Sequence, residues 1–261
     1  MAENKESNKP TMQTVDRALV ILNLLSTTSL GLSAIEISKA MNITRTTTYN
    51  MLNSLMADNY VERDEKTGRY YIGYRFLEIG SLYRFRYPFA TIAERYLSNF
   101  DSTFQANVCV YKPPMRVLQL IIRTSPLVNQ STTSRTMPAY ATACGKALLA
   151  AMPDDKLCEL LAKSEYRKYT KKTIDNADDL YQELLLIRER GYARETEELL
   201  PGRSCIGAVF RDMSGEVLGA ISLGGETAKL DEQMPAICNR LLDTVRMISA
   251  ELGYRYDYSA F

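Results

Sequence analysis

The side chains of this sequence that are best suited to specific recognition chemistry cluster at residues 43–50, which read ITRTTTYN. Their hydroxyl and amide groups both donate and accept hydrogen bonds, and one guanidinium adds a permanent positive charge. Such groups can hydrogen-bond to base edges and phosphates, and threonine methyl groups can contact the methyl group of thymine. The candidate recognition residues are Thr44, Arg45, Thr46, Thr47, Tyr49 and Asn50.

The lack of histidine and the number and spacing of the cysteines restrict the kinds of catalytic and metal sites that the chain can form. The chain has no histidine, which excludes a Ser-His-Asp triad, a Cys-His pair and every His-ligated metal site. Its five cysteines are odd in number and show no CxxC spacing, which argues against a disulfide framework or a zinc knuckle and favours a reducing cytoplasm. We therefore expect a cytoplasmic protein with no catalytic residue, no metal site and no cofactor.

Length and composition indicate two soluble domains. The chain has 261 residues and 46% hydrophobic residues, and no apolar run approaches the roughly 20 residues of a membrane span. The polar start, MAENKESNKPT, is not a signal peptide, and we expect residues 1–13 to form a disordered tail. The formal net charge of +1 neither requires nor excludes a nucleic acid partner.

Two helices are predicted ahead of the polar cluster. Apolar residues recur at helical spacing in Val15–Leu25, and Thr14 is placed to cap this helix. Ser33 and Glu36 have the spacing of a capping box, which predicts a short second helix that ends near Met41.

The polar cluster itself is predicted to begin a third helix. Thr44 can cap it, and a three-residue connection separates it from the second helix. This order is typical of a helix-turn-helix motif, whose second helix inserts its N-terminal end into the DNA major groove. The residues predicted to form its buried side are Thr48, Met51, Leu52, Leu55 and Met56.

A β-hairpin is predicted directly after this helix. The runs Tyr60–Arg63 and Arg69–Ile72 flank a turn that ends at Gly68. A hairpin in this position is a wing, and we expect Lys66 and Arg69 at its tip to approach phosphate or the minor groove. Residues 1–90 contain 11 Lys+Arg and 9 Asp+Glu, a net of +2, so DNA affinity would depend on a few placed cations and on dimerisation.

Residues 14–80 resemble the DNA-binding domain of the IclR family of bacterial transcriptional regulators. The resemblance is carried by VDRALVILNLL, GLSAIEISKAMNITRTTTYNMLNSLMADNYVERDEKTGRYYIG and YRFLEIG. The second half is similar to the effector domain of that family, through MPAYATACGKALLA, the segment TIDNADDLYQELLLIRERGYARETEELLPGRSCIGAVF and GEVLGAISLGG. Asn50 departs from the family, which often has Arg at this position.

The resemblance implies an α+β protein with a winged helix-turn-helix domain at residues 14–74, a linker helix at 75–88 and a GAF-like effector-binding domain at 89–261. The effector-binding domain would contain a mixed sheet with helices. The family implies binding to double-stranded operator DNA as a homodimer or homotetramer. The apolar residues of the linker helix suit a dimer contact or packing onto the protein's own domain equally well. These residues are Phe76, Leu77, Ile79, Leu82 and Tyr83.

The resemblance also implies the residues that hold a small carboxylate effector. They are Ala143, Cys144, Glu195, Cys205, Ser222 and Gly224. Amides at the start of a helix near Ala143 can bind an anion, Ser222 offers a hydroxyl, and Cys205 offers a weak thiol donor. This chain departs from the family at Glu195, where Asp is usual, at Gly224, where a second Ser is common, and at Cys144, where an aliphatic residue is typical.

We therefore expect a ligand-responsive transcriptional regulator, a repressor of a catabolic operon that senses a small organic or sugar acid. An activator of the same type is an alternative. A second alternative is an enzyme that uses Cys205 or Cys144 as a nucleophile, although the sequence shows no base for either thiol beyond Lys146. A third is a structural DNA-binding protein whose second half only mediates oligomerisation.

Overall fold

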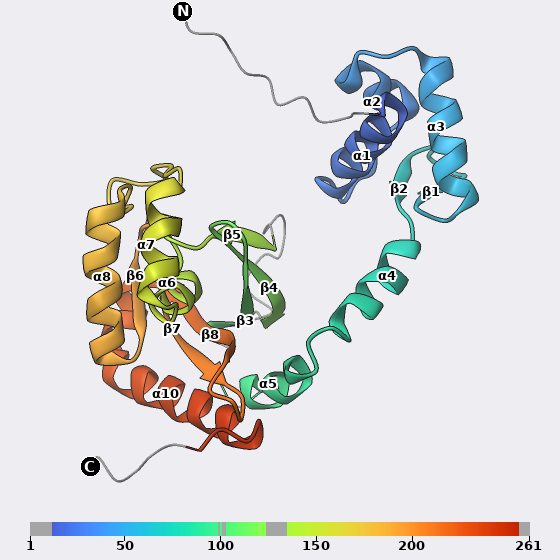
Figure 1. Ribbon diagram of the computed structural model, residues 1–261. Helices are drawn as coiled ribbons and strands as arrows, with labels where there is room; N and C mark the ends of the chain where they lie inside the picture. Colours follow the sequence, from blue (N-terminus) through green and yellow to red (C-terminus); the bar gives the residue numbers. More distant parts are fainter. Residues whose placement is uncertain (1–11, 99, 101–102, 124–134, 256–261) are drawn as a thin grey trace, which may run out of the picture. The chain divides into compact units, whose positions relative to one another are not determined.

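Figure 1 shows the computed structural model of the chain, which describes residues 12–98, 100, 103–123 and 135–255. The chain divides into two units, Met1–Arg86 and Tyr87–Phe261. Most of the tail expected at residues 1–13 lies outside the described residues, and its last residue, Gln13, already belongs to the first helix. Among the described residues, no helix is both long and apolar enough to cross a membrane.

The first unit consists of three helices, a hairpin and a further helix in its described part. Its elements are α1 (Gln13–Ser26), α2 (Ala34–Met41), α3 (Arg45–Ala57), β1 (Val61–Arg63), β2 (Tyr70–Ile72) and α4 (Arg75–Arg84). The small core between α1, α2, α3 and the hairpin is built from Ile21, Leu25, Ile37, Met51, Leu52, Val61 and Tyr70. Thr48 is also fully buried, and Leu55 and Met56 pack against this core, as their spacing predicts.

Local capping chemistry determines where α2 and α3 begin. The Glu36 amide donates to the Ser33 hydroxyl at 3.3 Å, and the Ser33 amide donates to the Glu36 carboxylate at 2.7 Å, so the predicted capping box is confirmed. Asn42 ends α2 in the left-handed conformation with φ of 51°, which a short polar side chain tolerates. The predicted cap at Thr14 is wrong, because α1 begins one residue earlier at Gln13, and its N-cap residue, Met12, makes no side-chain cap bond.

The helix expected at residues 75–88 is shorter than predicted. α4 ends at Arg84, and a new helix, α5 (Phe89–Leu97), follows Pro88. Proline cannot donate a backbone hydrogen bond and disfavours helical geometry in the residue before it, so a continuous helix through Tyr87 is interrupted there. α5 ends at Leu97.

The second unit is built on a six-stranded sheet with the order β5-β4-β3-β8-β7-β6. Its strands are β3 (Gln105–Lys112), β4 (Arg116–Arg123), β5 (Thr136–Pro138), β6 (Ala193–Thr196), β7 (Arg203–Arg211) and β8 (Val217–Glu226). Its helices after α5 are α6 (Ala143–Ala150), α7 (Asp154–Lys163), α8 (Ala177–Arg190), α9 (Thr227–Glu232) and α10 (Met234–Glu251). The α+β class is confirmed. The sheet expected to be mixed is instead antiparallel in every described pairing.

Helices cover both faces of this sheet, as Figure 1 shows. On one face, Ala106, Val108 and Val110 of β3 contribute to a core shared with α5 and α10. On the other face, Cys109 contributes to a core shared with α6, α7 and α8. Because successive side chains of a strand point to opposite faces, Asn107 lies on the same face as Cys109, beneath α6.

The start of α6 packs unusually close to the sheet. A Cβ atom placed on Gly207 of β7 would lie 2.9 Å from the carbonyl carbon of Ala143 and 3.0 Å from the amide nitrogen of Cys144. A Cβ atom on Gly145 would lie 2.1 Å from the carbonyl oxygen of Ala139. Only glycine permits these approaches, so the two glycines hold the N-terminal end of α6 directly over β7.

Candidate functional site

The N-terminal end of α3 is organised by the hydroxyls of its own threonines. The Thr47 amide donates to the Thr44 hydroxyl at 3.2 Å, and the two hydroxyl oxygens lie 2.8 Å apart. The Thr48 hydroxyl donates to the carbonyl oxygen of Thr44 at 3.1 Å, and its side chain is fully buried. The predicted N-cap at Thr44 is confirmed. Thr44, Thr47 and Thr48 therefore use their hydroxyls within the helix itself, which leaves fewer free groups for recognition.

Four other predicted recognition residues present their side chains to solvent. Arg45, Thr46, Tyr49 and Asn50 are exposed, and the side chains of these residues form no hydrogen bond or ion pair with any other described residue. They occupy the first turns of α3, where the helix dipole places partial positive charge. This end of α3 is therefore a free, polar surface that carries one cation.

The hairpin forms as predicted, with the Asp64 carboxylate organising its turn. The amides of Lys66 and Thr67 donate to Asp64 Oδ1 at 2.8 and 2.9 Å, and Gly68 adopts φ of +66°. The side chain of Lys66 is exposed and forms no ion pair with a described carboxylate. A free cation therefore lies at the tip of the wing.

Arg69, predicted at the same tip, is engaged elsewhere. Its guanidinium donates to the carbonyl oxygens of Leu30 and Gly31, both at 3.0 Å, and to the Glu36 carboxylate at 3.1 Å. The carboxylate that closes the α2 capping box thus also pairs with this cation. Arg69 attaches the wing to the connection between α1 and α2, because its donors are directed toward the protein itself.

The six residues assigned to an effector site all line one cavity of the second unit. The cavity has a volume of about 120 Å³, about the liquid volume of four water molecules. It lies between the sheet, the start of α6 and the segment after β6. Its lining residues are Gln105, Asn107, Gln119, Met137, Thr142, Ala143, Cys144, Glu195, Leu199, Leu200, Arg203, Cys205, Ser222 and Gly224.

Strand register explains why residues so far apart in sequence meet there. One row of paired residues crosses four strands through Gln105, Gly224, Cys205 and Glu195. The next row on the same face contains Asn107, Ser222 and Gly207. A Cβ atom on Gly224 would lie 2.5 Å from the Cys205 sulfur, so any larger residue there would require the thiol to move.

Several polar lining residues were not found by sequence reasoning. The Gln105 amide donates to Asn107 Oδ1 at 3.0 Å, and the Asn107 amide donates to the Ser222 hydroxyl at 3.2 Å. These three side chains form a hydrogen-bonded chain across β3 and β8. Two of these residues could have been recognised in the sequence, because each is a polar residue within an otherwise apolar strand. They are Asn107 in NVCVY and Gln119 in RVLQLII. Arg203 left no such signal.

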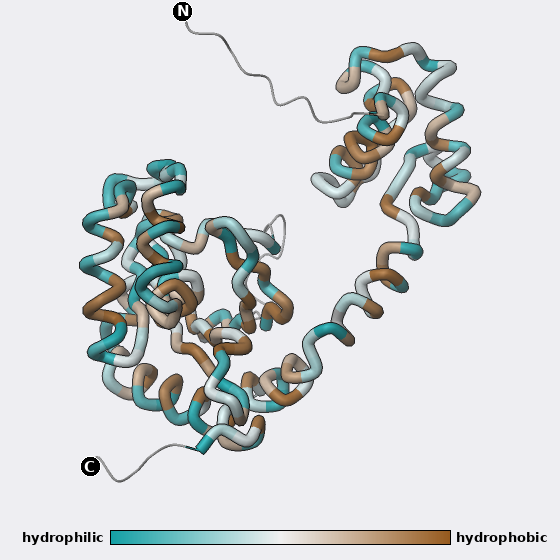
Figure 2. The backbone as a smooth tube through the Cα atoms, viewed as in Figure 1, coloured by the Kyte–Doolittle hydropathy of each residue, from teal (hydrophilic) through white to brown (hydrophobic). Residues whose placement is uncertain are grey.

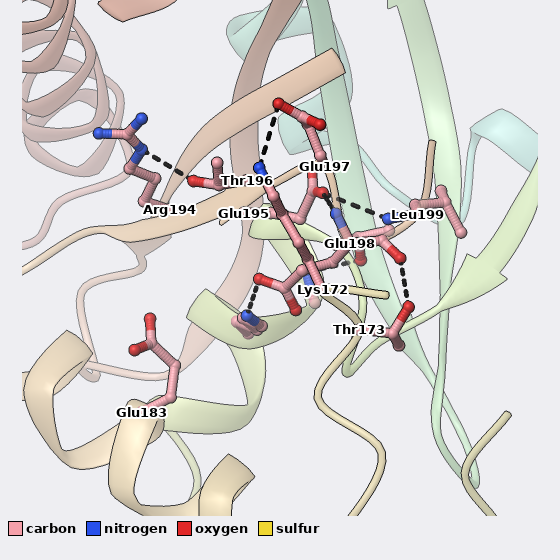
Figure 3. A network of polar contacts seen from close by, with 12 residues as sticks. Lys172, Thr173, Glu183, Arg194, Glu195, Thr196, Glu197, Glu198 and Leu199 are labelled. Carbon is pink, nitrogen blue, oxygen red and sulfur yellow. Dashed lines mark hydrogen bonds and ion pairs between the residues drawn. The ribbon is translucent and has the colours of Figure 1, made fainter. Parts of the chain in front are cut away.

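Glu195 is the principal ionisable acid of the cavity wall. It is 3% exposed, and one carboxylate oxygen accepts from the amide of Leu199 at 3.3 Å and from the amide of Glu198, as Figure 3 shows. Burial, reinforced by the nearby Glu198 carboxylate, raises the pKa of Glu195 to about 7 against the opposing effects of the two amides and of Lys146. Near neutral pH the group therefore exists in both protonated and ionised forms.

A buried ion pair lies beside Glu195. Lys146 of α6 is 1% exposed, and its ammonium group contacts the Glu198 carboxylate at 2.5 Å. The second oxygen of Glu198 has no hydrogen-bond partner among the described residues, and burial raises the pKa of this carboxyl above its usual value although Lys146 opposes the shift. The pair holds the segment after β6 against α6 and thereby positions Glu195.

The cavity thiols are poorly suited to nucleophilic chemistry. Burial raises the pKa of Cys205, and the Glu195 carboxylate raises it further. The Cys144 thiol donates to the carbonyl oxygen of Ala220 at 3.7 Å. Because the thiolate is the reactive form, a raised pKa argues against Cys205 as a nucleophile.

Two family models match the chain over both units. The model of the IclR helix-turn-helix domain matches residues 14–65, and the model described as bacterial transcriptional regulator IclR C-terminal matches residues 115–250. Together they include α1 to α3 and nearly all of the cavity-lining elements.

Full-length relatives agree with this assignment. The HTH-type transcriptional regulator XynR of Escherichia coli K12 is 26% identical over 250 residues, which cover 94% of this chain and 99% of that protein. The HTH-type transcriptional repressor AllR of the same strain is 27% identical over 248 residues, which cover 93% of this chain and 91% of AllR. The crystal structure of the Thermotoga maritima IclR superposes with a TM-score of 0.81 at 26% identity and covers 94% of this chain and 100% of that one.

Proposed function

The chain belongs to the IclR family of bacterial transcriptional regulators, and from this premise we propose that α3 reads operator DNA while the cavity senses a small acid. Residues 14–74 form the DNA-binding domain, residues 75–88 the linker and residues 89–261 the effector-binding domain, in a protein that acts in the cytoplasm. The observation that supports the sensing half best is that one cavity is lined by all six residues assigned to the effector site.

The DNA contacts are assigned to the free side chains at the front of α3 and to the wing. Arg45, Thr46, Tyr49 and Asn50 approach the bases, and Lys66 contacts a phosphate. The Thr44 hydroxyl caps the helix and is hydrogen-bonded to the Thr47 hydroxyl, and both retain acceptor capacity toward a base or a bound water. Arg69 contributes through the position of the wing, because its donors are already used within the protein.

Selection of genomic fragments from the source organism tests this assignment and supplies the operator. Arg45→Ala is expected to reduce affinity for the selected fragment by about 1–3 kcal/mol if the guanidinium reads a base. Arg246→Ala serves as the matched control, since Arg246 is an exposed arginine of α10 in the other unit. Equal affinities of wild type and Arg45→Ala at the same salt concentration would remove Arg45 from the interface.

The effector is assigned to the class of small organic or sugar acids. Amides of Ala143 and Cys144 at the start of α6 attract an anion, and Thr142 caps the following turn by accepting from the Gly145 amide at 3.3 Å. Binding is tested by thermal shift with a panel of such acids, because a ligand of the folded state raises its stability by RT ln(1 + [L]/Kd). No shift with any acid of the panel would contradict the sensing role.

Self-association is assigned to apolar side chains of the first unit. In α4, Leu77 is 74% exposed and Leu82 is 66% exposed, and Leu19 of α1 is 52% exposed. Figure 2 shows apolar residues along both helices. Large exposed apolar side chains are typical of protein–protein contacts when they gather on one surface, and the partner proposed for these helices is a second copy of the chain. Sedimentation at micromolar concentration tests it, with a monomer as the contradicting result.

The direction of regulation is proposed to be repression that the effector relieves. One relative carries the name repressor, and the chain resembles it over nearly its whole length. In vitro transcription from the selected promoter should fall when the protein is added and recover when the acid is added. A rise in transcription on addition of protein would assign it as an activator.

A further inference from the structure

Gln119 is a buried acceptor that lacks a donor. It lies on β4 and is 2% exposed, and its side-chain oxygen has no hydrogen-bond partner among the described residues. A buried acceptor without a partner loses the hydrogen bond that it would make with water in the unfolded chain, which destabilises the folded state. Because Gln119 lines the cavity, a ligand in the cavity is the natural source of the missing donor, and that donor must be an O–H or N–H group.

Arg203 is a cation that has no counter-ion among the residues the structure describes. It lines the cavity from β7 and is half-buried. Its guanidinium forms no ion pair with a described carboxylate, whereas Arg194, Arg190 and Arg188 of the same region are all paired. Its register partner on β8, Glu226, contacts Lys229 instead, at 3.1 Å. A partly desolvated guanidinium favours a carboxylate because its fork of donors can bind both oxygens.

The start of α6 provides a second anion-binding position at some distance from Arg203. The amide of Cys144 lies over Gly207, which is four residues from Arg203 along β7, or roughly 13 Å of strand. Along β7, Arg203 therefore lies on one side of Cys205, and Gly207 with the start of α6 lies on the other. Glu195 is the register partner of Cys205 and occupies the same middle position. Gln119 lines the cavity from the opposite half of the sheet, because β3 and β8 separate its strand, β4, from β7.

The cavity between these groups is small. Its volume of about 120 Å³ suits an acid of a few carbons. Glu195 adjoins the same space, and burial raises its pKa to about 7, so a protonated Glu195 can lie beside an anion without repelling it. A ligand with one carboxylate would satisfy only one of the two anion-binding positions.

We propose that the effector is a short hydroxy-dicarboxylic acid, with one carboxylate on the α6 amides, the other on Arg203, and a hydroxyl that donates to Gln119. This inference rests on the proposed sensing role and narrows it to one ligand class. Gln119 and Arg203 are the residues that determine specificity, and the sequence comparison with the family did not assign either of them.

Three four-carbon acids separate the contribution of the ligand hydroxyl to affinity from that of the second carboxylate. Malate has two carboxylates and a hydroxyl, succinate lacks the hydroxyl, and 2-hydroxybutyrate lacks the second carboxylate. Calorimetric titration of the full-length protein is expected to show malate binding at least about tenfold more tightly than either analogue, a difference of about 1.4 kcal/mol. Succinate that matches malate would overturn the hydroxyl contact, and 2-hydroxybutyrate that matches malate would overturn the contact with Arg203.

Substitutions at Gln119 and Arg203 test which residue is responsible for each preference among the three acids. Gln119→Met should lower malate affinity to that of succinate and leave succinate unchanged. Arg203→Met should weaken malate and succinate and leave 2-hydroxybutyrate unchanged. Gln182→Met and Arg246→Met, at exposed positions outside the cavity, are the matched controls and should behave as wild type. A variant that weakens all three acids equally would show a general loss of the site and would overturn the specificity role of that residue.

A wider acid panel separates failure of this inference from failure of the proposed function. If none of the three four-carbon acids binds at about 10 mM while a monocarboxylic sugar acid does, the cavity is a sensor and the hydroxy-dicarboxylate class is wrong. If no acid binds while the folded protein still retains operator DNA, both the ligand class and the sensing role are wrong.

Discussion

The buried carboxyl of Glu195 should make the stability of the effector-binding unit depend on pH in a direction opposite to that of most carboxylates. Its pKa is about 7 in the folded protein against the usual 4.5. Between pH 4.5 and pH 7, the folded state therefore keeps a proton on Glu195 that the unfolded state has released. The contribution of Glu195 to stability is greatest below about pH 4.5 and is lost as the pH rises through about 7. A difference of about 2.5 pKa units corresponds to about 3 kcal/mol in total.

Glu195→Gln should remove this contribution while preserving the local hydrogen bonds. The glutamine oxygen can still accept from the amides of Glu198 and Leu199, because these contacts use a single carboxylate oxygen in the native protein. Of the total, about 2 kcal/mol falls between about pH 5.5 and about pH 8. For a unit of this size, that is a difference in melting temperature of about 4–8 °C.

The assay is thermal unfolding of the full-length protein at a series of pH values. It is followed by circular dichroism, since the chain has no tryptophan. Wild type and Glu195→Gln should nearly coincide at about pH 5 and diverge as pH rises, with the variant the more stable. Glu165→Gln is the matched control, because Glu165 is exposed and outside the cavity, and it should track wild type. Curves for wild type and Glu195→Gln that stay parallel across the range would refute the reasoning, since Glu198 and Lys146 are common to both proteins.

Four further outcomes follow from particular contacts. Ser222→Ala removes the hydroxyl that accepts from Asn107 and should weaken the thermal shift caused by the effector without altering operator affinity; superimposable ligand titrations would contradict the assignment. Gly207→Ala should destabilise the second unit by about 1–3 kcal/mol and reduce the ligand response, because its Cβ would meet the backbone of α6; wild-type stability would show that α6 moves freely. Arg69→Met should lower the melting temperature of the first unit and, through the displaced wing, operator affinity, since it deletes hydrogen bonds that join the wing to the α1–α2 connection; unchanged operator binding would remove the wing from the DNA contact. Leu77→Ser should shift the sedimentation of the protein toward monomer, because Leu77 is largely exposed on α4, and an unchanged dimer would place the interface elsewhere.

The elements of the first unit follow from signals that lie within a few residues of one another. The capping box of α2, the cap at Thr44 and the turn at Gly68 are each formed by groups close in sequence. Helical spacing predicted the buried side of α3, because that spacing reports one face directly. The wrong predictions concern two helix ends, whose positions depend on the surrounding structure. They are the predicted cap at Thr14 and the end of the linker helix, which lies at Arg84.

The edge strands and one helix of the second unit escaped prediction. β5 has three residues and β6 has four, too few for an alternating pattern to stand out from the surrounding chain. α9 is also short, at six residues. The predicted mixture of parallel and antiparallel pairs was wrong because pairing direction depends on how strands distant in sequence meet, which no local pattern records.

The amino-acid sequence by itself determined which segments become capped helices, where the wing turns, and that chemistry would depend on hydroxyl, amide and guanidinium groups in a chain without histidine. Its resemblance to a family also identified six cavity residues. Only the tertiary structure decided that Arg69 attaches the wing to the protein, that Asn107 meets Ser222 across 115 positions of chain, and that Gln119 and Arg203 share the cavity unpartnered among the described residues. The physical reason is that hydrogen-bond partners and burial are set by strand register and close packing, and burial in turn sets the pKa of Glu195.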